Sequence, residues 1–145
     1  MKTLYPNQSG AILILFGLLL VPLLGLLGYA VDWTRAQAMQ RELQAAVDAA
    51  AFAGGKSFHL GDDGLKKVIQ DYFAENWWTK PRDVRLGAFT VGIDRVGTTE
   101  YAKRLAIHVD AYVPTYFLAV IGVRWLHAAA ETSLAVPRIK DDESR

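Results

Sequence analysis

Cysteine is absent from this 145-residue chain, which excludes disulfides, thiolate metal sites and cysteine nucleophiles. The chain also lacks an excess of either charge, because 16 lysines and arginines face 15 aspartates and glutamates, for a net charge of +1. No basic stripe interleaved with aromatic residues occurs along it, so nucleic acid is not an expected partner. The length is typical of one domain.

Charge is also missing from one long apolar run, Ala11 to Val31, AILILFGLLLVPLLGLLGYAV. At about 1.5 Å per residue, a helix of this length crosses the roughly 30 Å of bilayer hydrocarbon. We therefore expect a short N-terminal tail over residues 1–10, a transmembrane helix over 11–31, and Asp32 at the exit into water. A cleaved signal peptide is the competing interpretation, because Gly28-Tyr29-Ala30 imitates a cleavage site, but the run exceeds the roughly 7–15 apolar residues of such a peptide.

The predicted span contains no ionisable side chain, so it offers no imidazole for a pigment or haem and no carboxylate for a proton path. We expect no cofactor and a role in packing. Gly17, Gly25 and Gly28 would let another helix approach closely. Their spacing is not GxxxG, and simple tolerance of glycine in lipid explains them equally well.

Helical spacing continues beyond the span over residues 32–53, with no helix breaker until Gly54-Gly55. Six positions form one face of this extension: Trp33, Ala36, Gln40, Leu43, Val47 and Ala50. We expect this alanine-rich face to cover the protein's own sheet, with binding of a partner as the alternative, while residues such as Arg35 and Gln44 stay in water. The predicted helix-packing interface consists of Gly17, Gly25, Gly28, Trp33, Ala36, Leu43, Val47 and Ala50.

A second amphipathic helix is predicted after the turn and cap signal Gly61-Asp62-Asp63-Gly64. Its apolar positions recur at i, i+3, i+4, i+7 and i+8: Leu65, Val68, Ile69, Tyr72 and Phe73. The helix should stop near Trp78, ahead of Lys80-Pro81. We expect Trp77 in the core, whereas Trp78 fits either the core or the lipid headgroups.

Three later segments alternate as strands do: 85–93, 104–113 and, more weakly, 125–136. The turn-rich residues 94–99 between the first two predict a hairpin. The expected fold class is α+β, a small antiparallel sheet with helices on one face, over an extramembrane domain of residues 32–136. Residues 137–145 read as a charged tail.

Patterns that carry chemistry are missing. Gly55-Lys56-Ser57 resembles the end of a phosphate-binding loop, but Ala50 stands where the first glycine is needed, so we interpret it as a helix end. His108 and Asp110 share a strand face, and an ordinary solvated face explains them better than half a metal site or a proton relay, for want of a third group. We predict no catalytic, cofactor-binding or metal-binding residues, and no small-molecule substrate.

The segment from Gly10 to Gly55 resembles the N-terminal region of TadE/TadG-like proteins, pilin-like components of the Tad (Flp) pilus machinery. Asp32, the stretch from Leu43 to Ala51, and Gly54 carry this resemblance, and VPTYFLAVIGV at 113–123 is similar to the family's strand, helical turn and glycine. The resemblance implies a bacterial cytoplasmic membrane protein with a cytoplasmic N-terminus and a periplasmic domain. Pilins of this class that are cleaved carry an acidic residue five positions after the cleavage glycine, whereas Leu15 stands there in this chain. That departure removes the physical reason for polymerisation as a major pilin.

Two functions remain after these exclusions, and neither is enzymatic. The first is a structural component of a multi-subunit membrane assembly, as the pilus-assembly resemblance implies. The alternative is an accessory subunit that stabilises another membrane complex, such as a photosynthetic core (reaction centre with light-harvesting proteins) or a respiratory complex. In both, the expected partners are the lipid bilayer and other membrane subunits contacted through the transmembrane helix.

Overall fold

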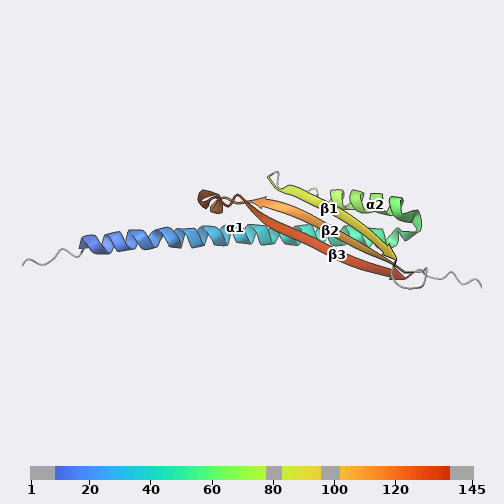
Figure 1. Cartoon of the computed structure of the whole chain (residues 1–145), viewed down its shortest axis with the longest axis horizontal. Helices are drawn as coiled ribbons and strands as arrows, with labels where there is room; N and C mark the ends of the chain where they lie inside the picture. The colour runs from blue at the N-terminus through green and yellow to red at the C-terminus, as the bar shows by residue number, and fades with distance from the viewer. Residues whose placement is uncertain (1–8, 78–82, 96–101, 138–145) are drawn as a thin grey trace, which may run out of the picture.

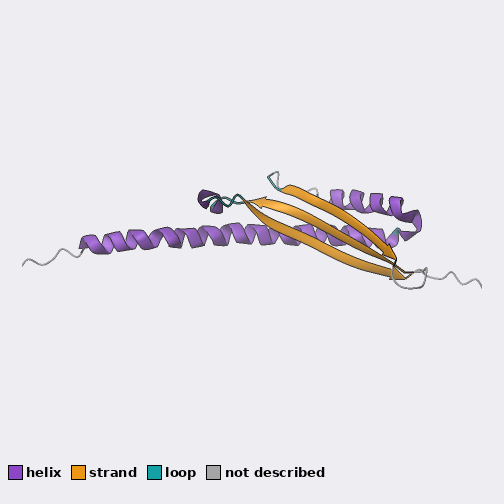
Figure 2. Ribbon diagram, in the orientation of Figure 1, coloured by secondary structure: helices purple, strands orange, loops and turns teal. Residues whose placement is uncertain are grey.

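A computed structural model describes residues 9–77, 83–95 and 102–137. It shows a long helix, and a three-stranded sheet and a second helix pack against the C-terminal half of this long helix (Figure 1, Figure 2). The predicted α+β class is confirmed. The elements follow the order α1 (Ser9–Lys56), η1 (Phe58–Leu60), α2 (Gly61–Asn76), β1 (Arg85–Arg95), β2 (Ala102–Pro114), η2 (Leu118–Ile121) and β3 (Trp125–Pro137).

Helix α1 is a single 48-residue helix that contains Pro22 without a break. Its N-terminal half projects beyond the sheet, and its C-terminal half lies along one face of it (Figure 1). The helix does not end before Gly54-Gly55 but runs through both to Lys56. At Gly54 an added Cβ would lie 2.9 Å from Ile69 Cγ1 and 3.0 Å from Leu105 Cδ2, so this glycine serves close packing inside the helix rather than ending it.

The sheet has the order β1-β2-β3, with both pairs antiparallel. Ile93 pairs with Leu105, and Leu105 pairs in turn with Leu134, so apolar positions of all three strands share one face. An irregularity between Leu86 and Phe89 shifts the register of β1. The central strand β2 carries the most deeply buried alternating set: Leu105, Ile107, Val109, Ala111 and Val113.

The core lies between this face of the sheet and the two helices. Helix α1 contributes Ala36, Met39, Leu43, Ala46, Val47 and Ala50. Gln40 was predicted on this face but is exposed, and Met39 is buried in its place. The buried stripe steps from Ala36 to the residue three positions later, which is as common in a helix as a step of four.

Helix α2 contributes its predicted stripe to the core through Leu65, Ile69 and Phe73. The Phe73 ring lies 4.8 Å from that of Phe89 and 6.0 Å from that of Trp77, which is buried as predicted. Trp78 lies outside the described residues. The predicted side-chain cap is wrong, because α2 begins at Gly61, directly after η1, and the capping position is Leu60, which makes no side-chain cap. Asp62 and Asp63 instead occupy the first turn, where their charge favours the helix dipole.

Candidate functional site

The connection between β2 and β3, residues 115–124, folds into a compact loop against α1 (Figure 1). The Thr115 amide donates to the Arg124 carbonyl at 3.1 Å, and the Thr115 hydroxyl donates to the Val123 carbonyl, so the two ends of the loop are tied together. Inside it, the turn η2 ends at Gly122, whose φ of 94° favours glycine. The loop is therefore a folded unit closed by its own hydrogen bonds.

Asp32 is the residue of α1 that holds this loop. Its carboxylate accepts backbone N–H groups of Tyr116 at 2.9 Å, Phe117 at 3.0 Å and Leu118 at 2.8 Å. The residue is only 2% exposed, so its side chain faces the loop and not water, while its place at the end of the predicted span stays a prediction. The physical reason is that three amides at the start of η2 have no partner within their own turn, and a carboxylate satisfies all of them. We call this arrangement the Asp32 clamp.

The protonation of Asp32 follows from the same contacts. Burial by itself raises the pKa of this carboxyl, but the amides of Leu118, Tyr116 and Phe117, together with the charge of Arg35, outweigh burial and lower the pKa below its ordinary value. A group whose pKa is lowered by folding stabilises the folded state above its unfolded pKa. The stabilisation is lost as the pH falls through the folded-state pKa.

We expect the clamp to persist from neutral pH to about pH 4 and to open in more acidic solution. Amide exchange of Tyr116, Phe117 and Leu118, corrected for intrinsic rates, measures this directly. The Asp32→Asn variant is the control and should show no such acid step. Loss of protection already near neutral pH in the wild type would contradict a lowered pKa.

Arg35, one turn after Asp32, contacts the same loop. Its guanidinium donates to the Pro114 carbonyl at 3.2 Å and to the Tyr116 hydroxyl at 3.3 Å, and it lies 4.0 Å from the centre of the Tyr116 ring. A longer ion pair of 3.7 Å reaches Asp83, ahead of β1. Arg35 is thus partly buried against the domain rather than free in water as predicted. Together the two side chains connect α1 to the end of β2, to the loop that follows it and to Asp83 ahead of β1.

Glycine permits the close approach of the loop to α1. A Cβ at Gly28 would lie 2.5 Å from Phe117 Cβ, closer than real atoms approach, so only glycine fits without movement. Among the residues that the structure describes, no atom lies within 4 Å of the position that a Cβ would take at Gly17 or Gly25. Trp33 is half exposed and stacks on Tyr29, with ring centres 5.9 Å apart.

Of the remaining members of the predicted helix-packing interface, Leu43, Val47 and Ala50 are buried in the protein's own core with residues of the sheet and α2, and Ala36 is also buried. Contact with another subunit through the predicted interface stays a prediction. The structure brings together Gly28, Asp32 and Arg35 around one loop, and leaves Gly17 and Gly25 apart from it.

The outward face of the sheet carries the other polar cluster. His108 and Asp110 do share that face, and His127 of β3 joins them, with its Nε2 2.7 Å from Asp110 Oδ1. The Nε2 of His108 lies 3.4 Å from the same oxygen. Sequence reasoning missed His127 because it is a neighbour only through cross-strand pairing. Both imidazoles are about half exposed, and among residues 9–77, 83–95 and 102–137 no group of three potential ligands is arranged to hold a metal ion.

Comparison with known protein families relates the N-terminal part of the chain to a described family. Residues 10–57 match the family model described as putative Flp pilus-assembly TadE/G-like, which confirms the resemblance over that segment. The matched segment coincides with α1, the helix that carries Gly28, Asp32 and Arg35. Neither the curated proteins nor the solved structures include a significant match.

Proposed function

We propose that this protein is a non-catalytic, single-pass structural component of a multi-subunit membrane assembly of the Flp pilus-assembly type. In this proposal α1 crosses the bacterial cytoplasmic membrane, the N-terminus is cytoplasmic, and the sheet and α2 lie in the periplasm. The observation that carries it is the division of α1 into an uncovered apolar half and a half built into the domain, on a segment that matches the family model.

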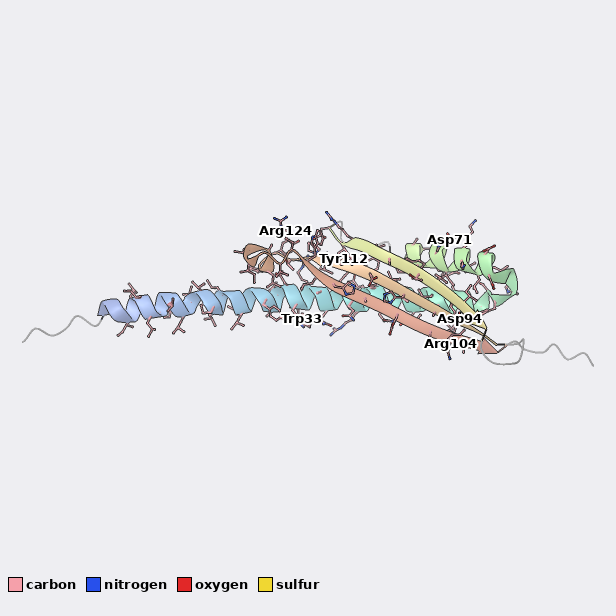
Figure 3. All side chains as sticks on the ribbon, in the orientation of Figure 1. Trp33, Asp71, Asp94, Arg104, Tyr112 and Arg124 are labelled. Carbon is pink, nitrogen blue, oxygen red and sulfur yellow. The ribbon has the colours of Figure 1, made fainter. Side chains whose placement is uncertain are left out.

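The uncovered half of α1 supports insertion into a bilayer. Large apolar side chains from Ile12 to Leu27 point outward on every side, with Ile14 76% exposed (Figure 3). Among the described residues this is the one helix long and apolar enough to cross a membrane, although a signal sequence near an N-terminus meets the same criterion. Insertion into lipid would remove this surface from water, and each Å² of apolar area removed stabilises the inserted state by about 25 cal/mol.

The absence of ionisable groups from residues 11–31 supports a role in holding subunits together. A chain of this kind packs against neighbours but supplies no proton donor or ligand within the hydrocarbon. The expected partners are therefore other membrane subunits and lipid. Gly17 and Gly25, which no part of the described domain covers, remain open positions for a neighbouring helix.

Purification of the native protein from membranes in mild detergent tests the assembly. Co-purification of pilus-assembly proteins would support the proposal. Recovery with subunits of a photosynthetic or respiratory complex would replace it with the accessory-subunit alternative. Release of the protein by alkaline extraction would contradict the membrane span itself.

We expect Gly25→Leu to weaken recovery of these partners several-fold, because the added side chain would separate two packed helices. The matched control is Ala30→Leu, an increase in size at another exposed position of the same helix. Quantitative recovery from mild detergent measures both. Unchanged recovery for Gly25→Leu would show that this glycine is not part of the interface. Gly28→Leu cannot test the interface, because the added side chain would clash with Phe117 of the same chain.

A further inference from the structure

The loop of residues 115–124 exposes its apolar side chains instead of burying them. Val120 is 86% exposed and Ile121 75%, with Phe117 about half exposed beside them. No charged residue occurs between Thr115 and Val123. The loop is nonetheless closed by its own hydrogen bonds and held by the Asp32 clamp, so the exposure belongs to an ordered surface.

The position of this loop along α1 identifies what can cover it. Phe117 packs on Gly28 and Leu118 is bound to Asp32, so the loop lies immediately beyond the uncovered apolar run that ends at Leu27. Figure 1 shows η2 beyond the end of the sheet, beside α1 and towards its N-terminal half. The exposed apolar surface of the loop is thus continuous with that of the helix. A bilayer that encloses α1 up to about residue 28 reaches the loop as well.

Side chains suited to the headgroup region lie at a similar level along α1 as the loop. Tyr29 and Trp33 form a stacked pair on α1, and Trp125 follows the loop at the start of β3. The Arg85 guanidinium lies 4.5 Å from the centre of the Trp125 ring, and Arg124 is exposed at the loop's end (Figure 3). Amphipathic rings favour the membrane interface, and arginine is attracted to anionic headgroups.

We propose that the 115–124 loop inserts its apolar tip, Val120 and Ile121, into the interfacial layer of the membrane that α1 crosses. This inference rests on the membrane span of the proposed function. Its occupant is lipid, not a further protein. The consequence is a second point of attachment: α1 and the loop together fix the rotation and tilt of the domain, and so the direction in which its other surfaces face a partner.

The absence of cysteine makes a direct test possible. A single cysteine at Ile121 of the full chain is labelled with a polarity-sensitive fluorophore and reconstituted into vesicles of phosphatidylethanolamine and phosphatidylglycerol. We expect a blue-shifted emission, several-fold stronger quenching by brominated lipid than at Ser133→Cys, and weak quenching by aqueous iodide. Ser133 is the control because it is exposed on the outward face of β3, near the far end of the sheet.

A label at Leu15→Cys separates this inference from the proposed function. If the Leu15 label is quenched by brominated lipid and the Ile121 label is not, the span stands and the loop insertion is overturned. If neither label is quenched, the membrane span itself has failed. Shielding of Ile121 from iodide in native membranes without quenching in lipid vesicles would show that a protein covers the loop, which also overturns the proposal.

Replacement of Val120 and Ile121 by serine provides a second readout that does not depend on labels. We expect the variant to resist alkaline extraction like the wild type, because α1 is unchanged. Chymotrypsin should cleave after Phe117 several-fold faster in vesicles, because the loop would leave the bilayer. Equal cleavage rates in wild type and variant would contradict insertion.

Discussion

Replacement of Asp32 by alanine is expected to release the 115–124 loop from α1. One buried amide, that of Leu118, and two part-buried amides, those of Tyr116 and Phe117, would lose their acceptor, and each unsatisfied buried donor costs about 1–3 kcal/mol. Because water can reach the amides of the released loop, we expect about 1 kcal/mol for each amide, or about 3 kcal/mol for the three together. This corresponds to a roughly hundredfold increase in the open population of the loop. Amide exchange at the three residues and the rate of chymotrypsin cleavage after Phe117 measure it.

Asp48→Ala is the matched control for this experiment. Asp48 lies on the same helix and accepts a hydrogen bond from Gln44 at 2.9 Å, but it is exposed. We expect a change below about 0.5 kcal/mol, as for most surface substitutions. Asp32→Glu should fall between the two, since it keeps the charge but displaces it by one methylene. Wild-type protection of the loop in Asp32→Ala would mean that Arg35 and Gly28 suffice to hold it.

The second large effect is expected for Leu43→Ala. Leu43 is 0% exposed in the core between α1, α2 and the sheet, and truncation of such a leucine costs about 2–5 kcal/mol through lost burial and the cavity left behind. For a domain of this size, a loss of about 3 kcal/mol lowers the Tm by roughly 12–24 °C. Near-ultraviolet circular dichroism of the full chain in detergent reports this transition, because it follows the packing of the aromatic residues.

Leu60→Ala removes the same atoms from a half-exposed position in η1 and should lower the Tm by only a few degrees. A similar loss in both variants would show that the core does not depend on the α1 face. An unchanged Tm for Leu43→Ala would place the stability of the domain elsewhere.

Most of the architecture could be predicted from residue patterns. The alternation around Phe89 and Ile107 placed two strands, and the i, i+3, i+4 recurrence of Leu65 and Ile69 placed α2. Side-chain periodicity is a local property of helices and strands, which is why it survives without tertiary information. The error at Gly54 has the same origin, because a glycine that ends a helix and a glycine that packs against Ile69 look alike in sequence.

The candidate site was not predictable in this way. The partners of Asp32 are backbone amides 84 to 86 positions away. Because nearly every residue type carries the same backbone amide, the sequence does not indicate which amides the carboxylate will bind. The sequence therefore placed Asp32 at the end of the apolar run but did not predict what its carboxylate binds. The contact of His127 with Asp110 was missed for a related reason, since it depends on the register between β2 and β3.

The order of residues alone was enough to establish an uncharged apolar run long enough for a membrane, the elements that follow it, and the faces they bury, because each depends on neighbours within a few positions. Tertiary folding determined that the β2–β3 loop returns to α1, that Gly28 gives it room, and that a buried carboxylate holds it. These features depend on where distant segments meet, and the free energy that positions them comes from contacts that exist only once the sheet has packed against the helix.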